Sequence, residues 1–273
     1  MKKILLVLTL VLGLLTLTSC DLSEEQRKER GILLVGASST PHAEILEYVK
    51  PLMEEKGYEL QIKVFDDYVL PNEALNNGEL DANYFQHTPY LNSYNKENKT
   101  NLVSAGLIHY EPFGLYGNGI TDLKNVPSGT QIIIPADDSN ETRALLLLAQ
   151  EGLIELDPTK TIETGITTFD ITNANGLKVD AVQADMVAAQ FKAGENILAV
   201  INGNYALAAN INVSDALATE AKDGDAALTY GNIIAVKNGN EDDERVKALV
   251  EILTSKEVKD WITEKYNGAV LPL

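Results

Sequence analysis

The sequence predicts an α/β protein with two lobes. Short apolar strands alternate with amphipathic helices in an early part of the chain, and the same alternation restarts near residue 131. No repeat, low-complexity tract or long linker separates the two parts. A chain that restarts this pattern without a linker is expected to cross from one lobe to the other and to return later. We therefore predict two lobes of largely parallel sheet, joined by two crossings.

The early elements follow from apolar runs, turn residues and proline positions. Thr40 followed by Pro41 is typical of a capped helix start, and Thr88 followed by Pro89 repeats the pattern. Pro51 is expected to kink the first helix. The strands are predicted at 31–36, 61–65 and 80–85, and the helices at 41–56, 71–77 and from residue 88 onward.

The later elements show the same alternation and end in two amphipathic helices. Strands are predicted at 131–135, 197–201 and 229–236, and helices at 140–150, 204–209, 246–253 and 258–266. The crossings are expected near residues 110–116 and 230–236. The predicted division is residues 31–112 with 234–273 in the first lobe and residues 113–233 in the second.

The first residues predict export and a lipid anchor. Lys2 and Lys3 precede an apolar stretch, and residues 1–19 have the pattern of a secretory signal. Leu17-Thr18-Ser19-Cys20 is similar to a bacterial lipobox, in which the cysteine carries acyl chains such as palmitate. A buried free thiol is the alternative, but the only cysteine of the chain stands where a signal peptidase would cut. Residues 20–30 are expected to be a flexible tether, and the protein to be anchored in the cell membrane, facing the periplasm or the exterior.

Several classes of function are disfavoured. The formal net charge of −18 argues against nucleic acid as a partner. The chain lacks a GxSxG nucleophile elbow, a phosphate-binding GxxxxGK loop and a GxGxxG motif. His42, His87 and His109 have no metal-ligand spacing. We therefore expect no enzyme activity, no metal and no cofactor.

The stretch from residue 65 to residue 91 contains four rings near strand ends and helix starts. They belong to Tyr68, Phe85, His87 and Tyr90. Rings at the edge of an α/β sheet either fill the core or line an apolar pocket for a small ligand. The sequence of this stretch alone leaves both interpretations open.

A possible anion site and two asparagines complete a candidate binding site. Arg143 is expected in the first turn of a helix, where a cation opposes the helix dipole unless an anion is bound there. The alternative is an exposed arginine paired with Glu141 or Asp138. Asn202 and Asn232 lie where apolar runs meet loops, the edge at which open α/β sheets bind ligands.

At these residues the chain resembles the methionine-binding lipoproteins of bacterial methionine ABC importers, the NlpA family. The resemblance runs from the lipobox to the C-terminus. Its most specific parts are FDDYVLPNEAL from residue 65, DANYFQHTPYL from residue 81, residues 140–148 and AVINGNYAL from residue 199. The resemblance implies a periplasmic-binding-protein fold, with two lobes joined by two crossover strands and the ligand in the cleft between them.

The resemblance also implies roles for individual residues. Arg143 is expected to pair with the ligand carboxylate, helped by Asn140, while Asn202 and Asn232 hold the α-amino and carboxylate groups. The rings expected to surround the methionine side chain are those of Tyr68, Phe85, His87 and Tyr90. No acidic residue is assigned to the ammonium group, so amide and backbone oxygens are expected to accept its protons.

One loop departs from the family pattern. Asp138, Ser139 and Thr142 stand where proline, threonine and glycine are usual. Thr142 is expected to narrow or reshape the loop and so to affect ligand preference, not the mode of binding.

The expected function is capture of methionine, with L-methionine preferred, and delivery to a membrane permease and its ATPase by a monomeric binding protein. Alternatives within this class are D-methionine, a methionine-containing dipeptide or another small amino acid. An alternative of another class is a surface lipoprotein that binds a host or envelope protein.

Overall fold

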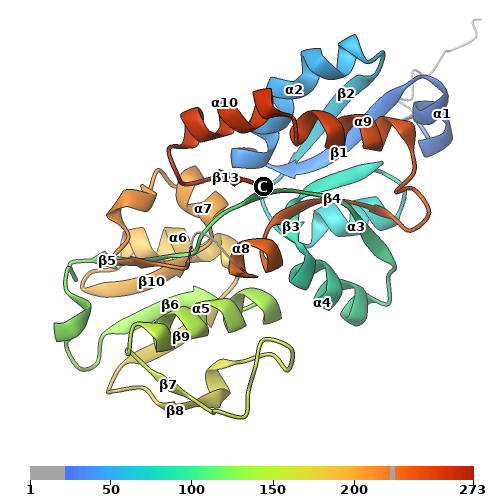
Figure 1. Ribbon diagram of the computed structural model, residues 1–273. Coiled ribbons are helices and arrows are strands. Elements are labelled where there is room, and N and C mark those ends of the chain that lie inside the picture. The colour runs from blue at the N-terminus through green and yellow to red at the C-terminus, as the bar shows by residue number, and fades with distance from the viewer. Residues whose placement is uncertain (1–21, 222–224) are drawn as a thin grey trace, which may run out of the picture.

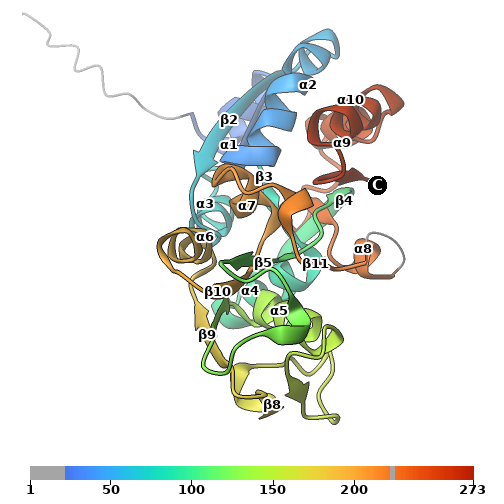
Figure 2. The same ribbon diagram turned by 90° about the vertical axis from the view of Figure 1, so that its left-hand side faces the viewer.

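Two mixed sheets, each covered by helices, make up the computed structural model, which describes residues 22–221 and 225–273 (Figure 1). The first sheet with α2, α9 and α10 lies in the upper part of Figure 1, and the second sheet with α5 lies in the lower part. Figure 2 shows the same two groups one above the other from the side. The two-lobed α/β prediction is confirmed.

The first sheet has the strand order β13-β4-β12-β3-β1-β2. Its strands are β1 Ile32–Ser38, β2 Glu59–Phe65, β3 Ala82–His87, β4 Leu102–Tyr110, β12 Asn232–Lys237 and β13 Leu271–Pro272. β1 is parallel to β2 and β3, whereas β12 is antiparallel to both β3 and β4. The expectation of a largely parallel sheet is wrong here, because β12 re-enters the sheet from the opposite direction.

Helices cover both faces of the first sheet. They are α2 Glu44–Glu55, α3 Leu70–Asn76, α4 Thr88–Asn98, α9 Glu244–Leu253 and α10 Lys256–Tyr266. Alternate strand residues point to opposite faces. Tyr84 and Ile234 therefore pack with the cluster under α2, α9 and α10, while Phe85 and Ile233 pack with the cluster under α3 and α4. Burial on both faces explains the continuous apolar runs in the sequence.

The second sheet has the order β11-β5-β10-β6-β9. Its strands are β5 Gly114–Asn118, β6 Gln131–Pro135, β9 Lys178–Val182, β10 Ile197–Ile201 and β11 Ala218–Thr219, and β7 Glu155–Leu156 pairs with β8 Ile171–Asn173 outside it. The helices of this lobe are α5 Asp138–Gln150, α6 Ala184–Ala193 and α7 Gly203–Ala208. Helix α8 Asp225–Thr229 lies between β11 and β12 in the chain, and its Ala227 belongs to a cluster against which Leu271 and Leu273 pack. Ile132 and Ile134 pack with α5, and Ile133 packs with α6 on the other face.

The chain changes sheets twice. The first change falls between the end of β4 at Tyr110 and the start of β5 at Gly114, and the second between the end of β11 at Thr219 and the start of β12 at Asn232. Since β12 begins at Asn232, the first-lobe sheet contains two residues that the sequence division gives to the second lobe. The strand expected at 229–236 begins later because helix α8 extends to Thr229.

One predicted helix start and one predicted helix cap are wrong. Thr40 has extended backbone angles (φ −142°, ψ 142°) inside a π-helical turn, η1 Ser39–Ala43, so the α-helix α2 begins only at Glu44. It then continues through Pro51 to Glu55. Helix α4 is capped by His87 rather than by Thr88, because the backbone N–H of Tyr90 donates to His87 Nδ1 at 3.2 Å.

The segment expected to be a flexible tether contains a docked helix, α1 Glu24–Glu29. Ser23 and Gln26 cap it reciprocally, and Arg27 is buried against the first lobe. Arg27 donates through Nε and Nη2 to the two oxygens of Asp81, at 2.9 and 3.2 Å, and through Nη1 to the carbonyl of Leu22 at 2.6 Å. The tether prediction is therefore wrong for residues 24–29.

The predicted signal and Cys20 lie outside the described residues. Among the helices of residues 22–221 and 225–273, none is long and apolar enough to span a membrane.

Candidate functional site

A pocket between the two sheets brings all eight predicted site residues together. The predicted residues that line it are Tyr68, Phe85, His87, Tyr90, Asn140, Arg143, Asn202 and Asn232; Gln86, Glu111, Phe113, Gly203 and Asn204 complete the lining.

The four rings form one continuous wall. The ring centroids of Tyr68 lie 5.7 Å from those of both Phe85 and Tyr90, and Phe85 and Tyr90 are 5.9 Å apart. His87 is 6.4 Å from Tyr90, edge to face. Each of these separations is within the range of interacting aromatic pairs. The alternative that the rings are only core is wrong, because all four face the pocket.

Local structure positions these rings. Asp67 Oδ1 accepts the backbone N–H groups of Val69 and Leu70, at 2.7 and 2.8 Å, and so forms the turn that carries Tyr68. Phe85 lies at the carboxyl end of β3, and Tyr90 lies in the first turn of α4. The hydroxyl of Tyr90 donates to the carbonyl of Tyr68 at 2.9 Å, which joins the two segments.

Arg143 is buried and makes a two-point ion pair. Helix α5 begins at Asp138, so Arg143 lies in its second turn, and the first-turn dipole argument is wrong. The expected alternative partners, Glu141 and Asp138, are also wrong. Arg143 Nε donates to Glu220 Oε1 at 2.7 Å, and Nη2 donates to Glu220 Oε2 at 2.6 Å.

Aromatic rings and backbone complete the surroundings of Arg143. Its guanidinium carbon lies 4.0 Å from the ring centre of Phe113 and 4.6 Å from that of Tyr230, and Nη2 also donates to the carbonyl of Glu111 at 2.8 Å. Burial lowers the pKa of Arg143, but the adjacent Glu220 carboxylate more than offsets this effect, so the net shift is upward. The pocket therefore contains a permanent, desolvated cation.

Asn140 and His87 join the two lobes. The amide nitrogen of Asn140 donates to Asp137 Oδ1 at 2.8 Å, and its Oδ1 lies 3.2 Å from His87 Nε2. Because His87 Nδ1 accepts the Tyr90 N–H, the ring proton is on Nε2 and points to Asn140. Burial, together with the Arg143 charge, lowers the pKa of His87 to about 3, so the ring is neutral.

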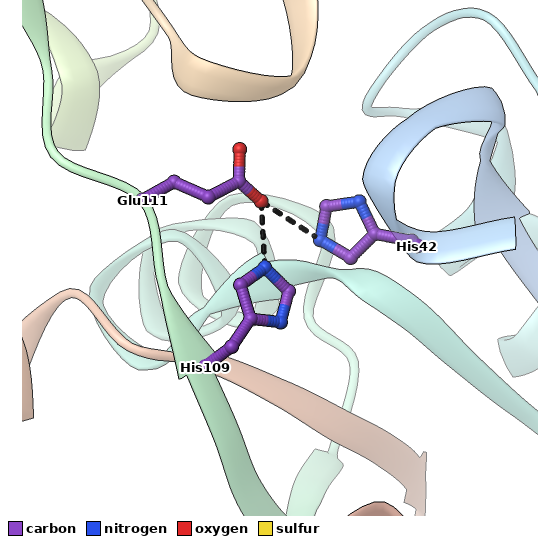
Figure 3. Close-up of side chains that lie close together, drawn as sticks. All are labelled: His42, His109 and Glu111. Carbon is purple, nitrogen blue, oxygen red and sulfur yellow. Dashed lines mark hydrogen bonds and ion pairs between the residues drawn. The ribbon is translucent and has the colours of Figure 1, made fainter. Parts of the chain in front are cut away.

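A buried carboxylate that the sequence reasoning missed also lines the pocket. Glu111 Oε1 lies 2.7 Å from His109 Nε2 and 3.4 Å from His42 Nε2 (Figure 3). Burial raises the pKa of Glu111, while the charge of Arg143 opposes that shift. A Cβ at Gly203 would lie only 2.7 Å from Glu111 Oε2, so glycine is required for this close approach.

His42, His109 and Glu111 have the composition of a metal site, since their donor atoms all lie within 4.8 Å of one another. The histidines are far apart in the sequence, so spacing did not predict this cluster. The 2.7 Å contact between His109 and Glu111 is a hydrogen-bond distance, and the Nδ1 atoms of both histidines are engaged by Ser38 and Tyr84. The arrangement is that of a hydrogen-bonded network.

The two predicted asparagines have different surroundings. Within the described residues, Asn202 Oδ1 is buried and has no hydrogen-bond partner. Asn232 Oδ1 lies 3.0 Å from His42 Nε2. Asn202 therefore offers the pocket a free acceptor, which an ammonium group would satisfy.

Thr142 is not among the residues that line the pocket. Its hydroxyl donates to the carbonyl of Ile166 at 3.1 Å and accepts the N–H of Ile166 at 2.7 Å. The Thr142 side chain therefore forms hydrogen bonds to a neighbouring loop and faces away from the pocket lining.

Comparison with known proteins gives the family. The profile of the NlpA lipoprotein family matches residues 33–273. The chain belongs to the NlpA lipoprotein family. It is 40% identical to the methionine-binding lipoprotein MetQ of Bacillus subtilis (strain 168) over 276 aligned residues, which cover 100% of this chain and 99% of that protein.

Solved structures agree with this membership. A pheromone cOB1 precursor/lipoprotein of the YaeC family from Enterococcus faecalis V583 shares 43% identity with this NlpA-family chain, at a TM-score of 0.81, covering 89% of this chain and 100% of that one. A nutrient-binding protein from Burkholderia cenocepacia, solved bound to methionine, shares 38% identity at a TM-score of 0.83, covering 88% and 99%.

The Arg143–Glu220 pair yields a stability prediction. Replacing Glu220 with glutamine leaves the Arg143 charge buried without its counter-ion, and breaking a buried pair in this way costs about 3–5 kcal/mol. We expect the unfolding free energy of the ligand-free protein, measured by urea denaturation, to fall by that amount.

The matched control is Glu195→Gln, which removes the same charge at an exposed position. It should change stability by less than about 0.5 kcal/mol. Equal changes in unfolding free energy for the two substitutions would contradict a stabilising role of the Arg143–Glu220 ion pair.

Proposed function

We propose that this protein is the substrate-binding lipoprotein of an ABC importer and that its ligand is methionine, the L-enantiomer in preference. The observation that carries the proposal is one pocket with a buried guanidinium, a buried carboxylate and a wall of four rings. An α-amino acid carries the complementary groups. The methionine in the Burkholderia cenocepacia structure supports this choice of ligand.

Arg143 is assigned to the ligand carboxylate, with Asn140 beside it. Nε and Nη2 are engaged by Glu220, while Nη1 forms no hydrogen bond within the described residues and is available to a ligand. A planar guanidinium already fixed by Glu220 loses little freedom when it binds a second carboxylate. Glu220 thus serves to orient the cation.

Glu111 and Asn202 are assigned to the ligand ammonium. Asn202 Oδ1 is an unsatisfied acceptor, and Glu111 Oε2 points toward the Gly203 side of the pocket. A buried carboxylate and an orphaned amide oxygen are both satisfied when a cation enters. The expectation that only amide and backbone oxygens accept the ammonium protons is replaced by this assignment.

The four rings are assigned to the ligand side chain. Contacts between a thioether and aromatic rings contribute about 0.3–1.5 kcal/mol each, so several rings together favour methionine over an aliphatic side chain. Shape alone in an apolar pocket would discriminate by only about 1–3 kcal/mol. The wall formed by Tyr68, Phe85, His87 and Tyr90 supplies both effects.

Closure of the two lobes around the ligand is the proposed signal to a permease and its ATPase. Tyr68 Oη donates to Asn204 Oδ1 at 2.6 Å, and Tyr205 Oη donates to the carbonyl of Asp66 at 3.0 Å. Both bonds join one lobe to the other, so separation of the lobes would break them. A ligand that contacts both lobes stabilises the closed form. No catalytic role is assigned to any residue, and the protein acts as a monomer.

The function is tested by isothermal calorimetry on protein that starts after Cys20, unfolded, freed of ligand and refolded. We expect tight binding of L-methionine and a loss of about a hundredfold or more in Arg143→Ala, because a buried hydrogen-bonded charge pair contributes about 2–5 kcal/mol. Circular dichroism verifies that the variant is folded.

The same titration with D-methionine, glycyl-methionine and norleucine tests ligand class. Absence of L-methionine binding by the refolded protein would contradict the assignment of methionine as the ligand. Tighter binding of one of the other three compounds would identify that compound as the better ligand. Full affinity in Arg143→Ala would remove only the carboxylate role.

The acidity of Glu111 predicts the pH dependence of binding. Burial raises the pKa of Glu111 above the ordinary value of 4.5, so this carboxylate becomes protonated at a higher pH than an exposed glutamate does. Protonation removes its attraction for the ammonium. We expect methionine affinity to fall with decreasing pH, by at most about tenfold per unit, and the fall to begin at a higher pH than the titration of an exposed glutamate would give.

Glu111→Gln is the control for this titration. It should bind more weakly at pH 7, and its affinity should no longer change in the range where wild-type affinity falls. An unaltered pH profile in this variant would contradict the assignment.

A lipid anchor at Cys20 is proposed for the full-length protein, holding it at the outer face of the cell membrane. The family description as a lipoprotein supports it. We expect Cys20→Ser to lose metabolic labelling with palmitate and to move from the membrane to the soluble fraction of lysed cells, with Ser19→Ala as the control. Membrane association that survives Cys20→Ser would argue for a different anchor.

A further inference from the structure

The side-chain amide of Asn232, like that of any asparagine, can place either its oxygen or its N–H₂ group toward the pocket. A contact behind the pocket selects one of these two orientations. Asn232 is the first residue of β12, and it pairs with His87 on one side and His109 on the other. Its Oδ1 lies 3.0 Å from Nε2 of His42, a residue of η1 that does not line the pocket. Reversing the amide would place an N–H₂ group at that position.

The proton of His42 is located by its neighbours. Nε2 lies 3.4 Å from Glu111 Oε1, a carboxylate oxygen that can only accept, so Nε2 must carry a hydrogen. Nδ1 lies 2.6 Å from Ser38 Oγ and accepts the hydroxyl proton. Burial lowers the pKa of His42 to about 4, in agreement with a neutral ring whose only proton is on Nε2.

His109 repeats the arrangement for Glu111. Its Nε2 donates to Glu111 Oε1 at 2.7 Å, and its Nδ1 accepts from the hydroxyl of Tyr84. Figure 3 shows His42 and His109 both directed at this one oxygen of the carboxylate. The second oxygen, Oε2, remains on the side of Gly203, which lines the pocket.

We propose that His42 is a positioning residue that fixes the Asn232 amide with its N–H₂ group toward the ligand. The Glu111 carboxylate sets the tautomer of His42, because it faces Nε2 and can only accept, and the Ser38 hydroxyl turns to donate to Nδ1. His42 then holds Asn232 Oδ1, which leaves the N–H₂ group of Asn232 to face the pocket. The Asn232 side chain therefore donates hydrogen bonds to a carboxylate oxygen and disfavours an ammonium group. Asn202, with its free Oδ1, has the opposite polarity, so the two asparagines set the direction in which an amino acid enters.

This inference rests on the proposed function for the identity of the ligand, and a double-mutant cycle tests the coupling. L-methionine affinity is measured for the wild type, His42→Leu, Asn232→Ala and the double variant. We expect His42→Leu to weaken binding about tenfold or more, since it frees the amide to reverse. In the Asn232→Ala background the same change should cost less than about threefold.

His42→Gln is the matched control, because a glutamine amide nitrogen can donate from nearly the position of Nε2. It should remain within about threefold of the wild type. Equal losses for His42→Leu in the two backgrounds would overturn the proposal, as would a loss in His42→Gln as large as that in His42→Leu.

A measurement on the wild-type protein without ligand tests the network separately from the function. Long-range ¹H–¹⁵N NMR distinguishes the two nitrogens of a neutral imidazole, and we expect His42 to carry its proton on Nε2. A proton on Nδ1, or a doubly protonated ring at pH 7, would overturn the proposal whether or not methionine binds. A His42 proton on Nε2 in a protein that does not bind methionine would contradict the proposed function but not the hydrogen-bonded network.

Discussion

The burial of the Arg143 guanidinium is the constraint on which the organisation of the site depends. A cation removed from water requires a counter-ion and a full set of acceptors, and both come from the segments where the chain changes lobes. Glu220 follows β11, and the carbonyl of Glu111 follows β4. Glu220 also accepts the backbone N–H of Phe113 at 2.9 Å, so the two crossings are joined through one carboxylate. The need to neutralise the Arg143 charge therefore holds the segment after β4 and the segment after β11 next to each other.

The site combines fixed charges with neutral histidines. Burial keeps His42, His87 and His109 uncharged at neutral pH, so each can donate one hydrogen and accept another at defined positions. Their protons point to Asn232, Asn140 and Glu111 respectively. The histidines therefore define donor and acceptor directions without adding positive charge beside Arg143. Such pre-orientation lowers the reorganisation that binding requires.

The sequence predicted the fold class and the eight pocket residues better than it predicted their partners. Apolar runs such as QIIIP and ILAVI indicated doubly covered strands, because this signal is local. Arg143 was also singled out, although by an argument that is wrong, because it lies in the second turn of α5 and not in the first. Glu111 and Glu220 were missed because an acidic residue among 40 becomes distinctive only when folding buries it. His42 and Asn232 are 190 residues apart, so no spacing rule joins them.

The docked helix α1 limits the distance that could separate the folded body from a lipid anchor at Cys20. Arg27 fixes the carbonyl of Leu22 to the folded body, and Asp21 alone separates Leu22 from Cys20. An extended chain spans about 3.3–3.6 Å per residue, so an acylated Cys20 would hold the first lobe within roughly 10 Å of the lipid surface. A connection of this length would allow the protein to rotate at the membrane surface but would not allow it to move away from the membrane. The protein would search for a permease in two dimensions, at a high effective concentration, and the ligand alone would diffuse in three.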